Sequence, residues 1–249
     1  MNFPIYAPYK HSIIIPKLIV EHALKLEKKA QTDLITHDER GLSIHDPDGL
    51  LTRVVGIQPQ SYEYKTQLGN KIASSTGGFK SINLTYLPER PDSINMQFYK
   101  DENSQLRSFL FLPDDNWRWR PDSEAEIFKT FVEQFNLEKI HLVRLIYLSP
   151  PAVGGVHIDA SESAMKKYYN LRHGVSLTVN LLAGGGQLHF RVHDQVKNSD
   201  QGVDIWHFNP SVPHAVGNVT QKRIQLRIFG SLKNEHYLER LDLEKAIWS

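Results

Sequence analysis

The sequence predicts a mainly β domain with helices (α+β), a sandwich or jelly roll with N-terminal helices packed on one sheet. Two observations carry this prediction. The second half of the chain alternates short apolar segments with Gly and Pro turns, which is typical of a sandwich or barrel. The first half contains two segments with apolar residues at helical spacing, and another helical pattern closes the chain. Helices, then strands, then a closing helix fit helices that cover one sheet.

The predicted strands of this core end at turn-forming residues, such as Ser149-Pro150-Pro151 and Gly184-Gly185-Gly186. Their ranges are Ile140–Leu148, Val175–Leu182, Gln187–His193, Gly202–Phe208, Pro213–Gly217 and Arg223–Phe229. Weaker alternation earlier in the chain predicts additional strands. These ranges are Lys80–Leu87, Ser93–Tyr99 and Leu106–Leu112.

Three helices are expected. The first covers Pro16–Gln31, where proline suits the first turn. The second begins at Ser123, which forms a capping box with Glu126. The third covers Lys233–Trp248. We therefore expect a single domain over residues 1–249. Residues 1–136 would form a support region that lines a pocket, residues 137–232 the strand core and residues 233–249 a C-terminal helix.

Composition excludes several classes of protein. The chain has 29 Lys and Arg against 28 Asp and Glu, for a net charge of +1, so bulk electrostatics disfavour nucleic acid as a partner. It has no Cys, which excludes disulfides, thiolate metal sites and a Cys nucleophile. No signal peptide or membrane-spanning run is apparent, so we expect a soluble, cytoplasmic protein with no membrane partner.

A candidate metal site begins at His157-Ile158-Asp159. In extended backbone, positions i and i+2 point to the same side, so one imidazole and one carboxylate can bind the same ion. His214 is the best candidate for a third ligand. Two histidines and one carboxylate form the facial triad of non-haem Fe(II), which leaves three coordination positions for a co-substrate and dioxygen.

Arg223 follows His214 after a turn, and a hairpin there would bring it beside the metal. Its guanidinium could pair with a dicarboxylate co-substrate. Arg223, Gln225 and Arg227 share one face of their strand, so Arg227 is the alternative for this role. Tyr147 could donate its hydroxyl to the co-substrate, although an ordinary core tyrosine is an equal alternative. Asn180 could likewise line the pocket or be a hydrogen-bonded core amide.

Other conspicuous residues have ordinary structural explanations. Four histidines in or beside strands are expected to be half-buried and hydrogen-bonded: His141, His189, His193 and His207. His189 and His193 share a strand face but lie too far apart for one ion. The Trp117-Arg118-Trp119-Arg120 segment could stack on a nucleobase or bind an acidic substrate, but we favour a loop that covers the sheet.

His157-x-Asp159, His214 and Arg223, in this order, resemble the Fe(II)/2-oxoglutarate-dependent oxygenases. The resemblance covers Ile140–Phe229 and implies a double-stranded β-helix, a distorted jelly roll. It also implies Fe(II) bound by His157, Asp159 and His214, with 2-oxoglutarate and O2 as co-substrates. Arg223 would bind the far carboxylate of 2-oxoglutarate, and Gln225 stands where some members have the Ser of an Arg-x-Ser pair. The intact Asp159 favours hydroxylation over halogenation.

The resemblance implies a dioxygenase that hydroxylates a C–H bond of a small molecule, with succinate and CO2 as co-products. A free amino acid or related metabolite is the first expectation, a residue in a peptide or protein the second, and an alkylated base the third. The alternative is a cupin-type metalloprotein: an isomerase, a 2-oxoglutarate-independent dioxygenase or a ligand-binding barrel. His214 to Asn218 resembles the His-x-x-x-Asn end of a cupin motif, but His157-Ile158-Asp159 lacks the His-x-His of its start.

Overall fold

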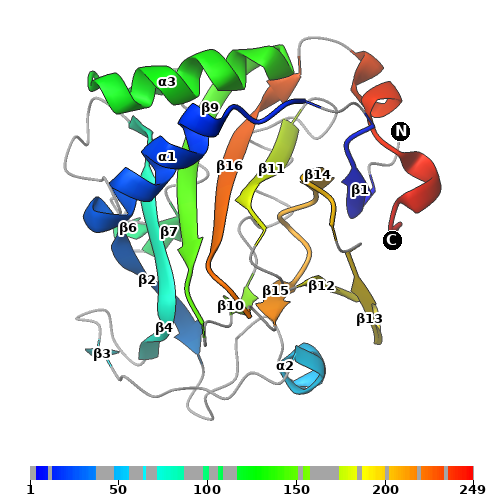
Figure 1. The fold of residues 1–249 in the computed structure, drawn as a ribbon. Coiled ribbons are helices and arrows are strands. Elements are labelled where there is room, and N and C mark those ends of the chain that lie inside the picture. The colour runs from blue at the N-terminus through cyan, green and yellow to red at the C-terminus, as the bar shows by residue number, and fades with distance from the viewer. Residues whose placement is uncertain are drawn as a thin grey trace.

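A computed structural model describes most of the chain as two antiparallel β-sheets with helices on the outside (Figure 1). The described residues are 4–10, 13–37, 48–55, 64–65, 72–86, 98–100, 106–108, 117–150, 154–157, 174–183, 187–199, 202–217, 220–232 and 235–248. The mainly β architecture with helices that the sequence predicts is confirmed.

The large sheet has eight strands. In spatial order they are β1 (Tyr6–Pro8), β14 (Ile205–Phe208), β11 (Gly174–Leu182), β16 (Arg223–Leu232), β9 (Leu137–Leu148), β4 (Ile72–Asn83) and β2 (Gln31–His37), with β3 (Tyr64–Lys65) also paired to β4. The small sheet has the order β10 (Gly154–His157), β15 (His214–Gly217), β12 (Gln187–Val192) and β13 (Gln195–Asn198). Two further pairs are β5 (Thr85–Tyr86) with β8 (Arg118–Trp119), and β6 (Phe98–Lys100) with β7 (Leu106–Ser108).

Successive strands of the second half of the chain change sheet in a regular way. β9, β11, β14 and β16 belong to the large sheet, whereas β10, β12, β13 and β15 belong to the small one. Each change of sheet places one strand of a sequential pair across the interior from the other. Residues that are far apart in the sequence therefore face the same interior space.

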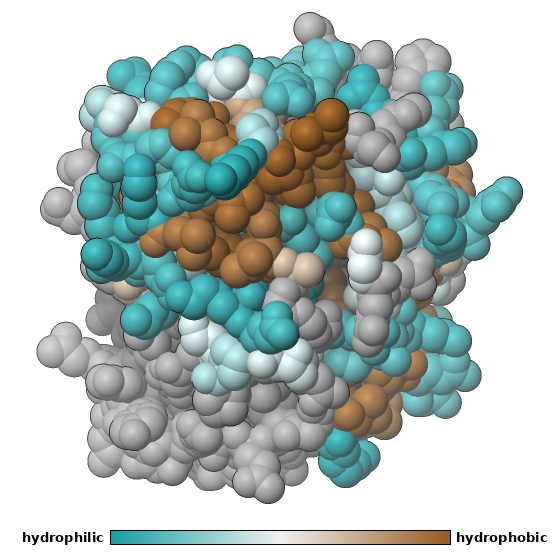
Figure 2. All heavy atoms as spheres, viewed as in Figure 1, coloured by the Kyte–Doolittle hydropathy of each residue, from teal (hydrophilic) through white to brown (hydrophobic). Residues whose placement is uncertain are grey.

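Helices cover one face of the large sheet. α1 (Lys17–Leu26) and α3 (Ser123–Val132) lie together on this side (Figure 1), each followed by a 3-10 turn, η1 (Glu27–Lys29) and η3 (Glu133–Phe135). Their buried residues, such as Ala23 and Phe128, form one core cluster with Leu145, Leu177 and Leu226 of the sheet. Apolar atoms remain visible on this side (Figure 2), and exposed apolar residues in or near α1 include Ile14, Leu18 and Leu24.

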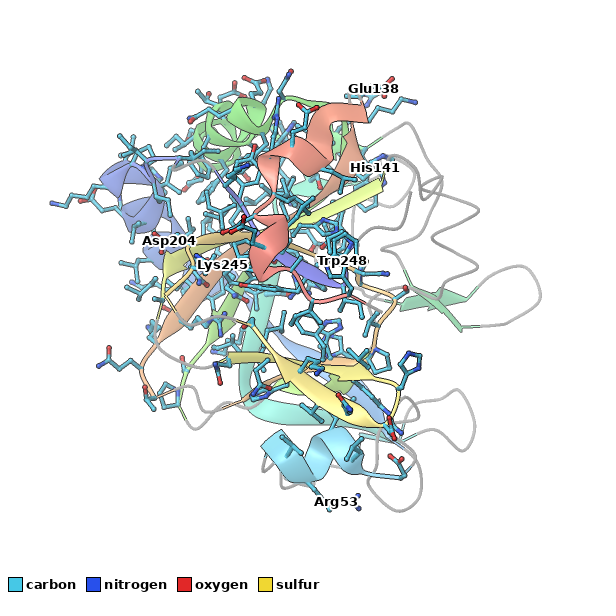
Figure 3. The ribbon with its side chains drawn as sticks, turned by 90° about the vertical axis from the view of Figure 1, so that its right-hand side faces the viewer. Arg53, Glu138, His141, Asp204, Lys245 and Trp248 are labelled. Atoms are coloured by element: carbon cyan, nitrogen blue, oxygen red, sulfur yellow. The ribbon has the colours of Figure 1, made fainter. Side chains whose placement is uncertain are left out.

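A second core cluster lies between the two sheets. The large sheet contributes residues such as Ile146 and Phe208, and the small sheet contributes residues such as Leu188, Phe190 and Val216. The short helix α2 (Leu50–Val55) lies on the other side of the small sheet (Figure 3). The order of layers is therefore helices, large sheet, small sheet and α2. None of the helices in the described part is long and apolar enough to cross a membrane.

The expected C-terminal helix is not continuous. The described residues of this segment form two short 3-10 helices, η4 (Glu235–Arg240) and η5 (Leu243–Lys245), and then extended backbone. The backbone amide of Ile247 donates to Tyr6, and that of Asp242 donates to Pro8. Backbone groups that pair with β1 cannot also form the i to i−4 bonds of a helix.

The start of α3 also differs from the expectation. Asp122, not Ser123, is the N-cap, because its carboxylate accepts a hydrogen bond of 2.8 Å from the backbone amide of Ala125. Asp is as good a cap as Ser, and Pro121 directly before it suits extended backbone. The helix therefore begins at Ser123 as the sequence predicts, but with the cap one residue earlier.

His207 gives the fold a defined sensitivity to acid. It lies opposite Leu177 on the side of β14 that faces the helices. Burial lowers the pKa of His207 to about 4, although a hydrogen bond to the carbonyl of Pro4 opposes this effect. The ordinary pKa of a histidine is 6.5, so the unfolded chain binds a proton at this ring below about pH 6.5. The folded chain does not bind this proton until the pH falls to about 4.

We therefore predict that the free energy of unfolding falls as the pH is lowered through this window. Relative to His207→Gln, which does not titrate and keeps a donor for the Pro4 carbonyl, the wild type should lose about 2 kcal/mol between about pH 7 and pH 5. Urea unfolding at the two pH values measures the difference. Parallel pH profiles of the two proteins would contradict the assignment.

Candidate metal centre

Two of the three predicted metal ligands meet across a strand pair. His157 is the last residue of β10, and His214 is the first residue of β15, its antiparallel neighbour. The two are directly opposite in register, and their ring centroids lie 4.4 Å apart with the planes tilted by 54°. Cross-strand partners point to the same side of a sheet. The imidazoles therefore project together towards the interior between the sheets.

The hydrogen bond of His214 fixes the ring tautomer that suits metal binding through Nε2. Nδ1 of His214 lies 2.8 Å from the carbonyl oxygen of Val212. A carbonyl oxygen only accepts, so Nδ1 carries the proton and the lone pair of the neutral ring is on Nε2. This is the usual arrangement for metal-binding histidines, in which an N–H donated to a backbone carbonyl fixes the tautomer and the ring orientation.

Aromatic rings fix the position of His214 further. The Phe208 ring lies 5.1 Å from the His214 ring in an edge-on orientation, and the Phe190 ring lies 6.3 Å away. His214 is fully buried and His157 is half-buried. The rings exclude water from the inner side of the pair, so the His157 side is the more exposed one.

Asp159, the third predicted ligand, lies outside the described residues, which stop at His157 on this strand. Within the described ranges, no group of three His, Cys, Asp or Glu side chains is placed to hold a metal ion. The structure thus brings together the two predicted histidines, and the place of the carboxylate remains an expectation from the spacing His157-x-Asp159.

The two rival histidines occupy other positions in or beside the small sheet. His189 pairs in register with Ala215, so it lies on the opposite face of the small sheet from His214. Its Nδ1 is 2.8 Å from Oδ1 of Asn198. His193 is exposed at the turn after β12, with a positive φ of 56°. These two histidines therefore have different surroundings.

The face of β16 across the interior is cationic. Arg223, Gln225 and Arg227 point to this side and are at most 5% exposed, whereas the alternating Ile224, Leu226 and Ile228 pack in the helix-facing core. This is the division of faces that the sequence predicts. Arg144 of β9, opposite Arg227 in register, adds a third buried guanidinium, which donates to the Ser81 hydroxyl.

Arg223 and Arg227 each lie over an aromatic ring of β14. Cζ of Arg223 is 5.7 Å from the centre of the Trp206 ring, and Cζ of Arg227 is 4.9 Å from the Phe208 ring. Burial, together with the charge of Arg227, lowers the pKa of Arg223 to about 10. The Arg223 guanidinium therefore remains charged at neutral pH. Because Phe208 also contacts His214, this ring lies between the histidine pair and Arg227.

The predicted amides lie on this same face. Asn180 is opposite Gln225 in register, and its Oδ1 accepts a hydrogen bond of 3.1 Å from Nε2 of Gln225. Nδ2 of Asn180 donates to the carbonyl of Val203 at 2.9 Å. Both ends of the Asn180 amide thus take part in protein contacts, which favours its reading as a hydrogen-bonded amide that orients Gln225.

Tyr147 is not at the site, which corrects its expected role. It lies opposite Ile224 in register and belongs to the helix-facing core. Its hydroxyl donates a hydrogen bond of 2.7 Å to the carbonyl of Ala23 in α1. Because side chains alternate along β9, Tyr147 faces away from the arginines. The other interpretation, an ordinary core tyrosine, is correct.

Sequence reasoning missed several residues of the interior face. The indole nitrogen of Trp206 and the hydroxyls of Ser176 and Thr178 are buried and have no hydrogen-bond partner among the described residues. Thr178 pairs in register with both Trp206 and Arg227, so these donors are neighbours. Alternation in Ile205–Phe208 could have placed Trp206 and Phe208 on one face, but nothing in the sequence indicates which face.

This donor set fits the carboxylate of an organic acid. The Trp206, Ser176 and Thr178 donors are costly to bury without partners, and a carboxylate could accept hydrogen bonds from them while its charge is attracted by the neighbouring guanidinium groups. The two imidazoles likewise fit a divalent metal such as iron. The interior therefore has two histidines on the small sheet that could hold a metal ion, and buried arginines on the large sheet that could pair with an anion.

The Trp117–Arg120 segment covers the sheet. Trp119 packs against the helix-facing core, and Nε of Arg120 donates to the carbonyl of Asn83 at 2.8 Å. These contacts hold the segment on the opposite side of the large sheet from the histidines. Its position agrees with the covering role that we favoured, although Arg118 and Trp119 form the short strand β8 and not a loop.

Several known structures have a low similarity to this chain. They include an oxidoreductase of the 2OG-Fe(II) oxygenase family from Burkholderia pseudomallei, with 11% identity over 90% of this chain and 94% of that one and a TM-score of 0.38. A prolyl-4-hydroxylase from Pseudomonas putida has 12% identity over 87% and 100%, and a TM-score of 0.34. A Trichoplax adhaerens prolyl hydroxylase, in complex with a hypoxia inducible factor peptide fragment, has 14% identity over 89% and 92%, and a TM-score of 0.35.

No family model and no curated protein sequence matches this chain. Because the identities and TM-scores of the similar structures are low, the function of this chain is inferred from its own residues.

The position of Tyr147 gives a prediction about stability. Tyr147→Phe removes the hydrogen bond to Ala23 and leaves a buried carbonyl without this donor, so the free energy of unfolding should fall by about 1 kcal/mol. If the chain binds a metal ion and 2-oxoglutarate, as the resemblance implies, the variant should bind both with unchanged affinity. Urea unfolding and ligand titration measure the two quantities, and weaker 2-oxoglutarate binding in the variant would return Tyr147 to the site.

Proposed function

We propose that this chain is an Fe(II)- and 2-oxoglutarate-dependent dioxygenase that hydroxylates a C–H bond. The observation that carries the proposal is the His157–His214 pair, which faces a buried arginine-bearing strand across the interior. The alternation of β9 to β16 between the two sheets supports a double-stranded β-helix, the jelly roll that the resemblance implies. Asp159 would complete the facial triad.

The residues have distinct tasks in this proposal. His157, Asp159 and His214 would hold Fe(II) on one face and leave its other positions open. When bound, Fe(II) and 2-oxoglutarate would supply the oxidation of a C–H bond by O2, with succinate and CO2 as co-products. The Val212 carbonyl keeps the His214 tautomer that binds a metal. Phe190 and Phe208 exclude water from the inner side of the centre.

Arg223 is our candidate for the far carboxylate of 2-oxoglutarate, with Gln225 beside it. Its guanidinium is buried against Trp206, where a charge-assisted pair is stronger than in water. Arg227 is the alternative, since it shares the face and lies over Phe208. For the substrate we propose a free amino acid or a related small metabolite, with a peptide residue as the alternative.

The metal ligands are tested by binding and turnover. The wild type should bind Fe(II) and then 2-oxoglutarate anaerobically, with a weak visible charge-transfer band, and release succinate in air. His214→Ala and Asp159→Ala should abolish the band and the succinate, because each removes one of three ligands. His193→Asn should behave as wild type, because this exposed histidine has a positive φ that Asn tolerates.

A protein that binds the metal but shows neither the band nor any need for 2-oxoglutarate would favour the cupin-type alternative. A screen of free amino acids for stimulated succinate release, with a product heavier by one oxygen atom, tests the substrate class. If only peptides stimulated succinate release in a parallel screen, the substrate would be a peptide residue and not a free amino acid.

The two arginines are separated by a matched pair of variants. Arg223→Gln should raise the 2-oxoglutarate concentration needed for half-saturation roughly 10- to 100-fold, because a charge-assisted pair is lost. Arg227→Gln should have a smaller effect. Anaerobic titration of the visible band measures both affinities. The opposite order of effects would transfer the carboxylate to Arg227.

A further inference from the structure

The small helix α2 packs on the back of the sheet that carries the two histidines. Leu51 of α2 is fully buried in a cluster with Val156 of β10 and Ala215 of β15, and Val196 of β13 packs against them. Val156 precedes His157, and Ala215 follows His214. Because side chains alternate along a strand, this cluster lies directly behind the histidine pair.

β10 has few other constraints on its position. It is an edge strand of four residues, and its one strand partner among the described residues is β15. The register between the two is irregular between Gly154 and His157. The contact of Val156 with Leu51 therefore supplies a second constraint on where His157 lies relative to His214.

An ion pair holds α2 in place. Both carboxylate oxygens of Asp48, just before the helix, accept hydrogen bonds from the Arg191 guanidinium of β12, at 2.6 Å for the Nη2–Oδ2 pair. These bonds hold the pKa of Asp48 well below its usual range. Asp48 also accepts from the backbone amide of Leu50 at 3.1 Å, and its carbonyl accepts from Arg53, which Figure 3 labels on α2.

Arg191 connects its ion pair with Asp48 to β15, the strand that begins at His214. Its backbone amide donates to the carbonyl of Pro213 at 2.9 Å, and Pro213 is the residue before His214. The neighbouring Phe190 is the register partner of His214. Direct contacts therefore connect α2, through Asp48 and Arg191, to the residue before β15. A second connection runs from Leu51 to Val156, the residue before His157 in β10.

We propose that Asp48, Arg191 and Leu51 are positioning residues for the metal centre, and that α2 sets the separation and orientation of His157 and His214. This inference rests on the proposed function, because it assumes that the two histidines bind one ion. Supporting contacts of this kind matter because ligands must be held within about 0.5 Å of the productive geometry.

Co(II), whose visible spectrum reports ligand geometry, is the probe for an anaerobic test of the full chain. Asp48→Asn keeps an acceptor for the Leu50 amide and removes the charge, and Arg191→Gln removes the other partner. Each should weaken Co(II) binding roughly 10-fold or more and change the visible spectrum of the bound ion. Arg191→Lys keeps the charge without the two-pronged contact, so its effect should be smaller.

The control is Glu27→Gln, which breaks a different long-range ion pair, the 2.8 Å contact of Glu27 with Lys222 on the helix side of the molecule. It should leave the Co(II) affinity and spectrum unchanged. Urea unfolding of every variant separates lost stability from altered metal geometry. Leu51→Met, a volume-conserving change, provides a second test of the packing contact, with a small spectral shift expected.

The possible failures are distinguishable. A wild type that does not bind Co(II) through His157 and His214 would overturn the proposed function and this inference together. If the wild type binds Co(II), but Asp48→Asn and Arg191→Gln retain its affinity and spectrum even though their stability falls, the proposed function stands. In that case α2 is only structural and the positioning role is wrong.

Discussion

The antiparallel register between β10 and β15 is the constraint on which the site depends. It places His157 opposite His214, so that both imidazole rings lie on the same side of the small sheet. A slip of one residue would point one imidazole outwards and Val156 or Ala215 inwards, because side chains alternate. The apolar cluster with Leu51 on the back of the sheet opposes such a slip, since it would leave a histidine against a buried leucine. Packing on one face thus specifies chemistry on the other.

The two faces of β16 show a similar division. Ile224, Leu226 and Ile228 join the core beneath α1 and α3, while Arg223 and Arg227 enter the space between the sheets. Burial of a guanidinium is unfavourable unless acceptors or π-faces compensate for the lost water. Trp206 and Phe208 provide part of this compensation. Two positive charges on one interior face also create a local potential that would attract an anion.

The sequence predicted those parts of the molecule whose pattern is local. Period-two alternation identified β16 and its two faces, and helical spacing identified α1 and α3. It could not predict which rings stand opposite His214, because Phe190 and Phe208 come from strands of different sheets. Nor could it place Tyr147, whose side of β9 depends on where the helices pack. The C-terminal segment failed for the same reason: its helical spacing is real, but tertiary pairing with β1 overrides local propensity.

That final segment has a consequence for the edge of the large sheet. β1 is the outermost strand on one side, and the bridge from Tyr6 to Ile247 occupies backbone groups that would otherwise face outwards. Exposed edge strands are templates for intermolecular pairing. The residues around Leu241 and Ile247 therefore protect this edge against pairing with another molecule. Truncated forms that lack them would aggregate more readily.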